Sequence, residues 1–200
     1  MFYYERKFKK QGYDFVIGID EAGRGPLAGP VVAAAAILLS SRFKTRIDDS
    51  KKLTPSLREK AFQEIIRKSE FGIGIVGEKT IDRINILEAT RMAMKQAIVS
   101  LVDKLKPGKS SGMHIIVDGN MPLDINFPYT SIIKGDSKSK SIACASILAK
   151  VIRDRIMFLY DRIYPEYGFL RHKGYPTKMH RAAVKRLGPS LIHRKSFCCV

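Results

Sequence analysis

The stretch VIGIDEAGRG, residues 16–25, joins a predicted buried strand to a pair of acids and a glycine turn. Four apolar or small residues lead directly into Asp20 and Glu21, and Gly-Arg-Gly follows. A short apolar run bounded by turn residues predicts a strand. Side chains alternate along a strand, so the two acids would point to opposite faces unless the glycines from Gly23 onward let the chain turn.

Further strands and helices are predicted after this stretch in the sequence. Apolar runs predict four more strands, at residues 29–39, 71–77, 113–120 and 129–136. The alanines of the first of these runs leave a helix possible, and the short loop before it predicts an antiparallel pair. Helical patterns cover about residues 53–70, 85–105, 139–164 and 176–187.

This order of elements predicts an α/β fold with a mixed five-stranded sheet flanked by helices and a C-terminal helical segment. Strands cluster first and alternate with helices later. The length of 200 residues fits a single domain spanning residues 1–200. Within it we expect an N-terminal extension at about residues 1–13 and a substrate-binding segment at about residues 165–200.

The charge balance predicts a polyanionic partner. The chain has 36 Lys and Arg against 19 Asp and Glu, a net charge of +17. A basic surface attracts phosphate backbones. A membrane surface is the weaker alternative, because the basic residues are scattered along the chain.

Cysteine usage and hydropathy predict a cytoplasmic protein. Cys144 lies in an apolar segment, and Cys198 and Cys199 lie at the C-terminus, a pattern that fits neither a disulfide framework nor a zinc site. The sequence shows no signal peptide and no apolar run long enough to span a membrane. We expect a monomer without a membrane partner.

Acidic residues end three of the predicted strands. They are Asp20 and Glu21, Asp118, and Asp136. If these strand ends meet at one edge of the sheet, the carboxylates repel each other unless a cation neutralises them. A cluster of oxygen ligands without His or Cys favours Mg²⁺ or Mn²⁺.

Each acid taken alone is more often a turn residue than a metal ligand. The repetition, in a chain rich in positive charge, favours a metal cluster for phosphodiester chemistry. Two ions held by carboxylates can activate a water and stabilise the departing oxygen.

Two other patterns carry less weight. Gly72, Gly74 and Gly77 have the spacing of a dinucleotide site, but they lie within an apolar run and do not open a helix after it. The four histidines lack metal-ligand spacing, so structural or phosphate-contact roles are favoured. They are His114, His172, His180 and His193.

Six motifs follow one another along most of the chain. They are GIDEAGRGPLAGPVVAAA (18–35), DDSKKL (48–53), NILEATRMAM (85–94), VDGN (117–120), KGDSKSKSIACASILAKVIRDRIM (134–157) and HKGYPTKMHRAAVKRLGPSLIHRKSF (172–197). In this order they resemble the bacterial ribonuclease HII family. Gly135 and Ser137 depart from the alanines expected beside Asp136, which itself is present.

The resemblance implies a ribonuclease H-like fold and hydrolysis that depends on two Mg²⁺ or Mn²⁺ ions. The implied substrates are RNA–DNA hybrids and duplex DNA containing ribonucleotides, cut to leave 3′-hydroxyl and 5′-phosphate ends. The implied metal-site and catalytic residues are Asp20, Glu21, Asp118 and Asp136.

The resemblance also implies a substrate-binding set. Gly23, Arg24 and Gly25 would contact the ribonucleotide and its 2′-hydroxyl, the only group that separates ribose from deoxyribose at a given site. Tyr175 would pack on the sugar beside the RNA–DNA junction. The candidates for phosphate contacts, which position a duplex without reading its sequence, are Lys51, Lys52, Lys138 and Arg194.

Two alternatives stay open at this point. A ribonuclease HIII resembles this chain with an added N-terminal domain, whereas only about a dozen residues precede the first predicted strand here. A basic nucleic-acid-binding module without catalysis is the other alternative. The acids argue against it, because negative charges in a phosphate-binding surface oppose binding unless metal neutralises them.

Overall fold

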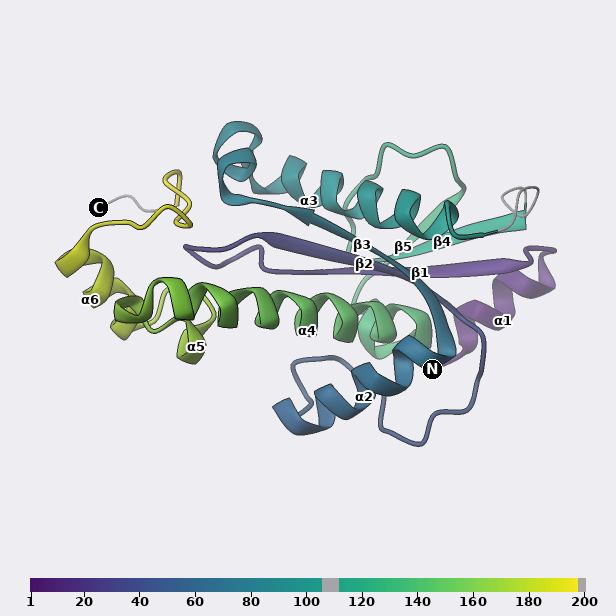
Figure 1. Cartoon of the computed structure of the whole chain (residues 1–200). Helices are drawn as coiled ribbons and strands as arrows, with labels where there is room; N and C mark the ends of the chain where they lie inside the picture. Colours follow the sequence, from purple (N-terminus) through teal and green to yellow (C-terminus); the bar gives the residue numbers. More distant parts are fainter. Residues whose placement is uncertain (106–111, 198–200) are drawn as a thin grey trace.

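A five-stranded mixed sheet forms the centre of the molecule in a computed structural model that describes residues 1–105 and 112–197 (Figure 1). Its strands are β1 (Phe15–Ala22), β2 (Val31–Leu38), β3 (Ser69–Val76), β4 (Met113–Asp118) and β5 (Tyr129–Ile132). They lie in the order β3-β2-β1-β4-β5. Strand β2 is antiparallel to β1 and β3, whereas β4 is parallel to β1 and β5 is parallel to β4. The predicted mixed sheet and its antiparallel first pair are confirmed.

Helices cover both faces of this sheet. The α-helices are α1 (Tyr3–Lys10), α2 (Pro55–Lys68), α3 (Glu78–Val102), α4 (Lys140–Ile163), α5 (Phe169–His172) and α6 (Lys178–Leu187), with 3₁₀ turns at Gly135–Ser137 and Pro165–Tyr167. Figure 1 shows α3 on one face and α2 and α4 on the other. Two apolar cores follow from this arrangement, one between the sheet and α3 and one between the sheet, α2 and α4.

The alanine-rich run forms strand β2, so the helical alternative is wrong. Its alternate alanines face the two cores, and Ala33, Ala34 and Ala35 are all fully buried. Small side chains let helices approach the sheet closely on both sides. Gly72 and Gly74 of β3 serve the same purpose, because a methyl group on either would collide with the backbone of α3.

The helix predicted at residues 85–105 is the second part of a longer one. Helix α3 begins at Glu78, and Asn85 interrupts it with a φ of 66°. The Asn85 side-chain oxygen accepts hydrogen bonds from the backbone N–H groups of Leu87 and Glu88, at 2.9 and 3.1 Å. Asn85 therefore caps the part that was predicted. Residues 106–111, which follow the helix pattern, lie outside the described residues.

The helices with clear N-caps agree with the sequence prediction. The Thr54 hydroxyl accepts from the N–H of Leu57 at 3.3 Å, and Ser139 caps α4 in the same way through Ile142. Helix α6 begins after Thr177 and ends before Gly188. Within residues 1–105 and 112–197, no helix is long and apolar enough to cross a membrane.

The N-terminal extension folds as helix α1 against the start of α4. The Glu5 carboxylate accepts from the hydroxyl of Ser139 at 2.6 Å and from the N–H of Ser141 at 2.9 Å. A carboxylate at the N-terminus of a helix satisfies free N–H groups and favours the helix dipole. The extension thus caps the N-terminus of α4, the helix that follows Asp136.

Candidate active site

Asp20 and Asp118 lie side by side because of the register between two parallel strands. The last residue pair that β1 and β4 share is Ile19 with Val117, and each aspartate comes next in its strand. Strand β1 continues along β2 through Ala22, whereas β4 ends at Asp118. Both carboxylates therefore lie where these two strands separate.

Asp136 reaches the same place from a turn, which corrects the prediction that it ends a strand. Strand β5 stops at Ile132, and Asp136 follows in the 3₁₀ turn that precedes α4. The N–H of Gly135 donates to the carboxylate of Asp118 at 2.6 Å, which ties this turn to the end of β4. One carboxylate oxygen from each of Asp20, Asp118 and Asp136 lies within 4.8 Å of the others. We call this trio the carboxylate edge.

Glu21 lies beside the carboxylate edge and is not part of it. The glycines do not redirect its side chain, since β1 stays in register with β2 through Glu21 and Ala22. Glu21 instead lines a hollow of about 300 Å³ with Asp118 and Arg24. Its carboxylate is 3.5 Å from the Arg24 guanidinium. Four acids were expected to converge, whereas three meet and the fourth lines the adjoining hollow.

Burial and mutual repulsion raise the pKa values of Asp20 and Asp136. Asp20 is only 6% exposed, and its burial raises its pKa well above the usual range. The neighbouring charges of Glu21 and Asp118 raise the pKa of Asp20 further, against the hydrogen bond from Ser146. Burial and then the charge of Asp118 likewise raise the pKa of Asp136. An all-oxygen donor set whose charges repel each other fits a hard divalent cation such as Mg²⁺ or Mn²⁺.

The lysines predicted to contact phosphate lie exposed around this edge. Lys51 is close enough to Asp136 for its charge to oppose the rise in the pKa of that acid. The Lys52 ammonium lies 3.6 Å from Asp48, and Lys138 is exposed just after the turn that carries Asp136. Their ammonium groups can therefore meet a phosphate backbone at the surface.

Arg194 has a different place from the one predicted. It is fully buried, and its guanidinium donates to the carbonyls of Gly23 at 2.6 Å, Arg24 at 2.9 Å and Gly29 at 2.7 Å. The prediction that Arg194 contacts phosphate does not fit this placement. Its nitrogens instead hold the loop that contains the Gly-Arg-Gly turn.

The structure brings the Gly-Arg-Gly turn and Tyr175 together across 150 residues of sequence. The N–H of Leu27 donates to the carbonyl of Gly174 at 2.8 Å. A methyl group on Gly25 would lie 4.0 Å from the Tyr175 ring, and that tyrosine is 39% exposed. We call the contact between residues 23–30 and residues 172–175 the loop junction.

Sequence analysis missed Arg153, which is fully buried beneath the loop junction. Its guanidinium lies 5.8 Å from the centre of the Tyr175 ring. Other charged residues, Lys150, Asp154 and Arg155 among them, lie close to it in the helix predicted at residues 139–164, so the sequence did not distinguish Arg153 from a solvated basic residue.

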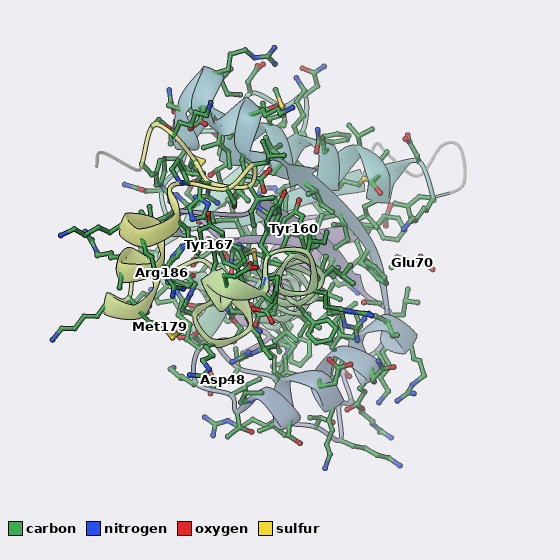
Figure 2. The ribbon with its side chains drawn as sticks, turned by 60° about the vertical axis from the view of Figure 1, so that its left-hand side comes forward. Asp48, Glu70, Tyr160, Tyr167, Met179 and Arg186 are labelled. Atoms are coloured by element: carbon green, nitrogen blue, oxygen red, sulfur yellow. The ribbon has the colours of Figure 1, made fainter. Side chains whose placement is uncertain are left out.

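Buried histidines connect the loop junction to the C-terminal helices. The N–H of Ser190 donates to Nδ1 of His193 at 2.9 Å, so the proton of that ring lies on Nε2. This Nε2 is 3.0 Å from Nε2 of His180, whose Nδ1 is 3.0 Å from the Tyr175 carbonyl. The hydrogen bonds thus run in one direction, from Ser190 to the backbone of Tyr175. The Tyr167 ring packs against His193, and Tyr160 packs against the apolar cluster that contains Tyr167; Figure 2 labels both tyrosines.

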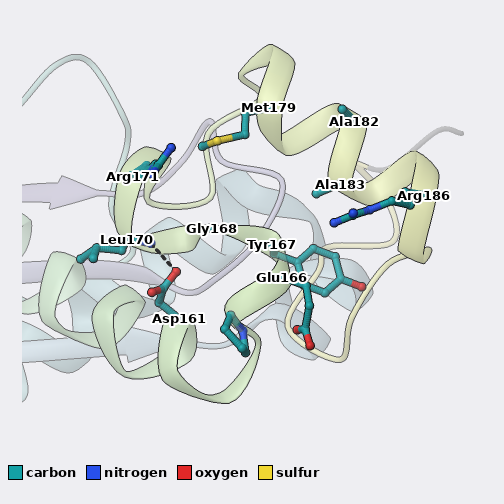
Figure 3. Close-up of a pocket in the computed structure, with 11 residues that line it drawn as sticks. Asp161, Glu166, Tyr167, Gly168, Leu170, Arg171, Met179, Ala182, Ala183 and Arg186 are labelled. Carbon is teal, nitrogen blue, oxygen red and sulfur yellow. Dashed lines mark hydrogen bonds between the residues drawn. The ribbon is translucent and has the colours of Figure 1, made fainter.

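A second hollow, of about 580 Å³, lies in the C-terminal segment beyond the loop junction (Figure 3). Tyr167, Met179 and Arg186 line it, together with Asp161. The Asp161 carboxylate accepts from the N–H of Leu170 at 2.8 Å. None of the individual residues predicted for catalysis or substrate binding lines this hollow, although most of its lining belongs to the segment at about residues 165–200 that was predicted to bind substrate.

Nearly the whole chain matches known proteins of a single family. A family model for ribonuclease HII matches residues 17–200. The chain belongs to the ribonuclease HII family. A ribonuclease HII from Acetivibrio thermocellus is 54% identical over 195 residues, which cover 97% of this chain and 73% of the relative. One from Caldicellulosiruptor saccharolyticus is 51% identical over 194 residues, which cover 96% of this chain and 91% of the relative.

Solved structures agree with this membership. Ribonuclease H2 from Pyrococcus horikoshii superposes with a TM-score of 0.71 at 28% identity, covering 91% of this chain and 93% of that one. Bst-RNase HIII in complex with Mn²⁺ has a TM-score of 0.73 at 19% identity, covering 92% of this chain and 67% of that one, and shows a shared fold. The ribonuclease H-like fold is confirmed, and as a member of this family the chain is a hydrolase of the ribonuclease H type.

Proposed function

We propose that this protein cuts the RNA strand of RNA–DNA hybrids and also cuts duplex DNA at single embedded ribonucleotides. The products are a 3′-hydroxyl and a 5′-phosphate, and the cut starts the removal of ribonucleotides from DNA. The observation that carries this proposal is the position of three carboxylates within 4.8 Å of one another, in two strands and a turn, beside the Gly-Arg-Gly turn. The cytoplasmic location and the monomeric state remain predictions from the sequence.

The residues that would hold two Mg²⁺ or Mn²⁺ ions are Asp20, Asp118 and Asp136, with Glu21 as a further ligand. Bound there, the ions would supply an activated water and stabilise the departing oxygen of the phosphodiester. The chain itself supplies fixed oxygen atoms, because Gly135 holds the Asp118 carboxylate and the Glu21 N–H holds the Asp20 carboxylate at 2.7 Å. Burial of Asp20 excludes water from one side of the site.

Recognition of the sugar is assigned to the loop junction. Gly23 has a φ of +101°, a conformation that favours glycine and lets the backbone approach a ligand closely. We propose that the backbone of residues 23–25 contacts the 2′-hydroxyl and that the exposed face of Tyr175 packs on the neighbouring sugar. Lys51, Lys52 and Lys138 would contact phosphates and set the position of the duplex.

The test is cleavage of an end-labelled DNA duplex that carries one ribonucleotide. We expect one cut at the ribonucleotide with Mg²⁺ or Mn²⁺, and no cut with EDTA. Binding without cleavage under every metal condition would support the alternative of a non-catalytic nucleic-acid-binding module. Cleavage of an all-RNA strand in a hybrid but not of the single-ribonucleotide duplex would limit the substrate to hybrids.

A further inference from the structure

Arg153 connects the two loops of the loop junction from below. It lies on α4 and is fully buried. Its Nε donates to the Pro30 carbonyl at 3.0 Å and its Nη2 to the Ala28 carbonyl at 3.1 Å, both in the first loop. Its Nη1 donates to the Lys173 carbonyl at 3.0 Å, in the second loop. One guanidinium thus fixes the backbone of both loops relative to α4.

Only an arginine can make this set of contacts. Its planar guanidinium presents five N–H donors in a rigid fork, whereas a lysine ammonium is a single point at the end of a flexible chain. The fit is tight, because a methyl group on Gly23 would collide with Nε of Arg153 and one on Gly29 would lie 3.3 Å from its Nη2. The guanidinium therefore fixes where the Gly-Arg-Gly turn begins and where its loop ends.

The same side chain sets the position of Tyr175. The Lys173 carbonyl that it holds is two residues before Tyr175, and the guanidinium lies 5.8 Å from the centre of the tyrosine ring. A guanidinium at this distance attracts the ring. The Lys150 ammonium also lies 5.8 Å from the centre of the Tyr175 ring.

We propose that Arg153 is a positioning residue that sets the spacing between the Gly-Arg-Gly turn and Tyr175. This spacing decides whether a single ribonucleotide meets the carboxylate edge in the reactive register. Arg153 touches neither the substrate nor the reacting phosphate. The proposal rests on the proposed function, since it concerns how that function selects a lone ribose.

The test is a double-substitution cycle with Arg153→Lys and Tyr175→Ala. Single-turnover rates are measured with Mg²⁺ on a duplex with one ribonucleotide and on a long RNA–DNA hybrid. We expect Arg153→Lys to lower the rate on the single ribonucleotide by about ten- to a hundredfold, because small misplacements of a reacting group have effects of this size. The hybrid, which offers several registers, should lose much less. In the Tyr175→Ala background, Arg153→Lys should add little, since coupled residues are not additive.

Arg155→Lys is the matched control. Arg155 lies on the same helix and is exposed. Its guanidinium is 2.6 Å from the Glu59 carboxylate, and neither residue belongs to the loop junction. The rates of this variant on both substrates should equal those of the wild type. Failure of the wild type to cut the single-ribonucleotide duplex would remove the proposed function itself, which separates that outcome from failure of the present proposal.

Two results would overturn the role of Arg153. One is an equal loss on both substrates, and the other is a full effect of Arg153→Lys in the Tyr175→Ala background. If Arg153→Lys does not fold, Gly174→Ala tests the same spacing with both buried arginines intact. Its methyl group would lie 2.5 Å from the Ala28 carbonyl and push the loops apart. It should show the same selective loss on the single ribonucleotide, and equal losses on the two substrates would again overturn the proposal.

Discussion

The carboxylate edge and the loop junction are neighbours, but different forces hold them in place. Backbone pairing places Asp20 and Asp118, since each follows the last pair of a parallel ladder between β1 and β4. At the loop junction, side chains of distant residues supplement the backbone hydrogen bond from Leu27 to Gly174. There the buried Arg153 and Arg194 donate to backbone carbonyls more than 120 residues away in the sequence.

This difference predicts how each region responds to substitution. A sheet ladder has many hydrogen bonds that support one another, so replacing one acid at its end changes the chemistry and leaves the geometry intact. The loop junction depends on a few guanidinium contacts, so replacing one side chain there moves backbone. Substitutions at the first region should stop cleavage of every substrate, and those at the second should change which substrate is cut.

The largest effect is expected for Asp20→Asn at the carboxylate edge. The substitution removes one of the proposed metal ligands together with its carboxylate charge. Cleavage of both substrates should fall by more than about a hundredfold, since even partners outside the ligand set of a metal are worth ten- to a hundredfold. Duplex binding should stay the same or tighten slightly. Single-turnover rates and binding titrations measure the two quantities.

Asp124→Asn is the matched control for this substitution. Its side chain is fully exposed and lies 3.7 Å from the Lys95 ammonium. It should leave the rates unchanged. Near-normal turnover of Asp20→Asn with Mg²⁺ would remove Asp20 from the metal site.

The second effect is a selective one, expected for Tyr175→Ala at the loop junction. If the ring packs on the sugar as proposed, its loss should loosen the register of the scissile phosphate. Cleavage of a single embedded ribonucleotide should drop by about ten- to a hundredfold. Long hybrids should lose less, and binding should hardly change, because phosphate contacts supply most of the affinity.

Tyr3→Ala, on the exposed face of α1, is the control and should have no effect on either rate. Equal losses on the two substrates in Tyr175→Ala would show that Tyr175 is ordinary packing.

A third substitution tests the backbone that supports the carboxylate edge. Gly18 of β1 lies against the first turn of α4, and an added methyl group would collide with Ser141 and Ile142. Gly18→Ala should lower the free energy of unfolding by about 1–3 kcal/mol, the usual range for overpacking. Thermal denaturation measures it. Gly77→Ala, where a methyl group meets open space, should change the melting temperature much less; equal shifts would mean that close packing at Gly18 is not required.

The smallest effect is a pH dependence of stability from His193. Burial, and then the charge of His180, lowers the pKa of His193 to about 4 in the folded chain. The unfolded chain binds this proton near its ordinary pKa of about 6.5. The stability that depends on a neutral His193 is therefore present above pH ~6.5 and lost as the pH falls toward the folded value. Melting temperatures between these values should fall less steeply for His193→Gln, and identical slopes would contradict the linkage.

The sequence predicted the residues of the carboxylate edge better than the residues that support the loop junction, and the reason is physical. An apolar run that stops at an acid is a local pattern, so Asp20 and Asp118 could be found without a structure. Asp136 was found for the wrong reason, because a turn and not a strand carries it. Arg153 was missed and Arg194 was predicted to contact phosphate, since their burial depends on contacts between distant segments that no local pattern records.

The interruption at Asn85 shows the same limit on the scale of a helix. Its capping side chain marks the start of the second part of α3, and the pattern of apolar residues after it predicted that part correctly. The first part, from Glu78, has no such repeat and forms by packing against the rest of the fold.

The central claim is that the carboxylate edge carries out cleavage and the loop junction selects the sugar. The most direct test is the ratio of two cleavage rates during a Mg²⁺ titration. The ratio compares single-turnover cleavage of the single-ribonucleotide duplex with that of a long hybrid. In the wild type both rates should fall together as Mg²⁺ becomes limiting, so the ratio should stay constant. In Tyr175→Ala the ratio should be lower by about tenfold or more at every Mg²⁺ concentration. A wild-type ratio that changes with Mg²⁺, or an unchanged ratio in Tyr175→Ala, would contradict the account.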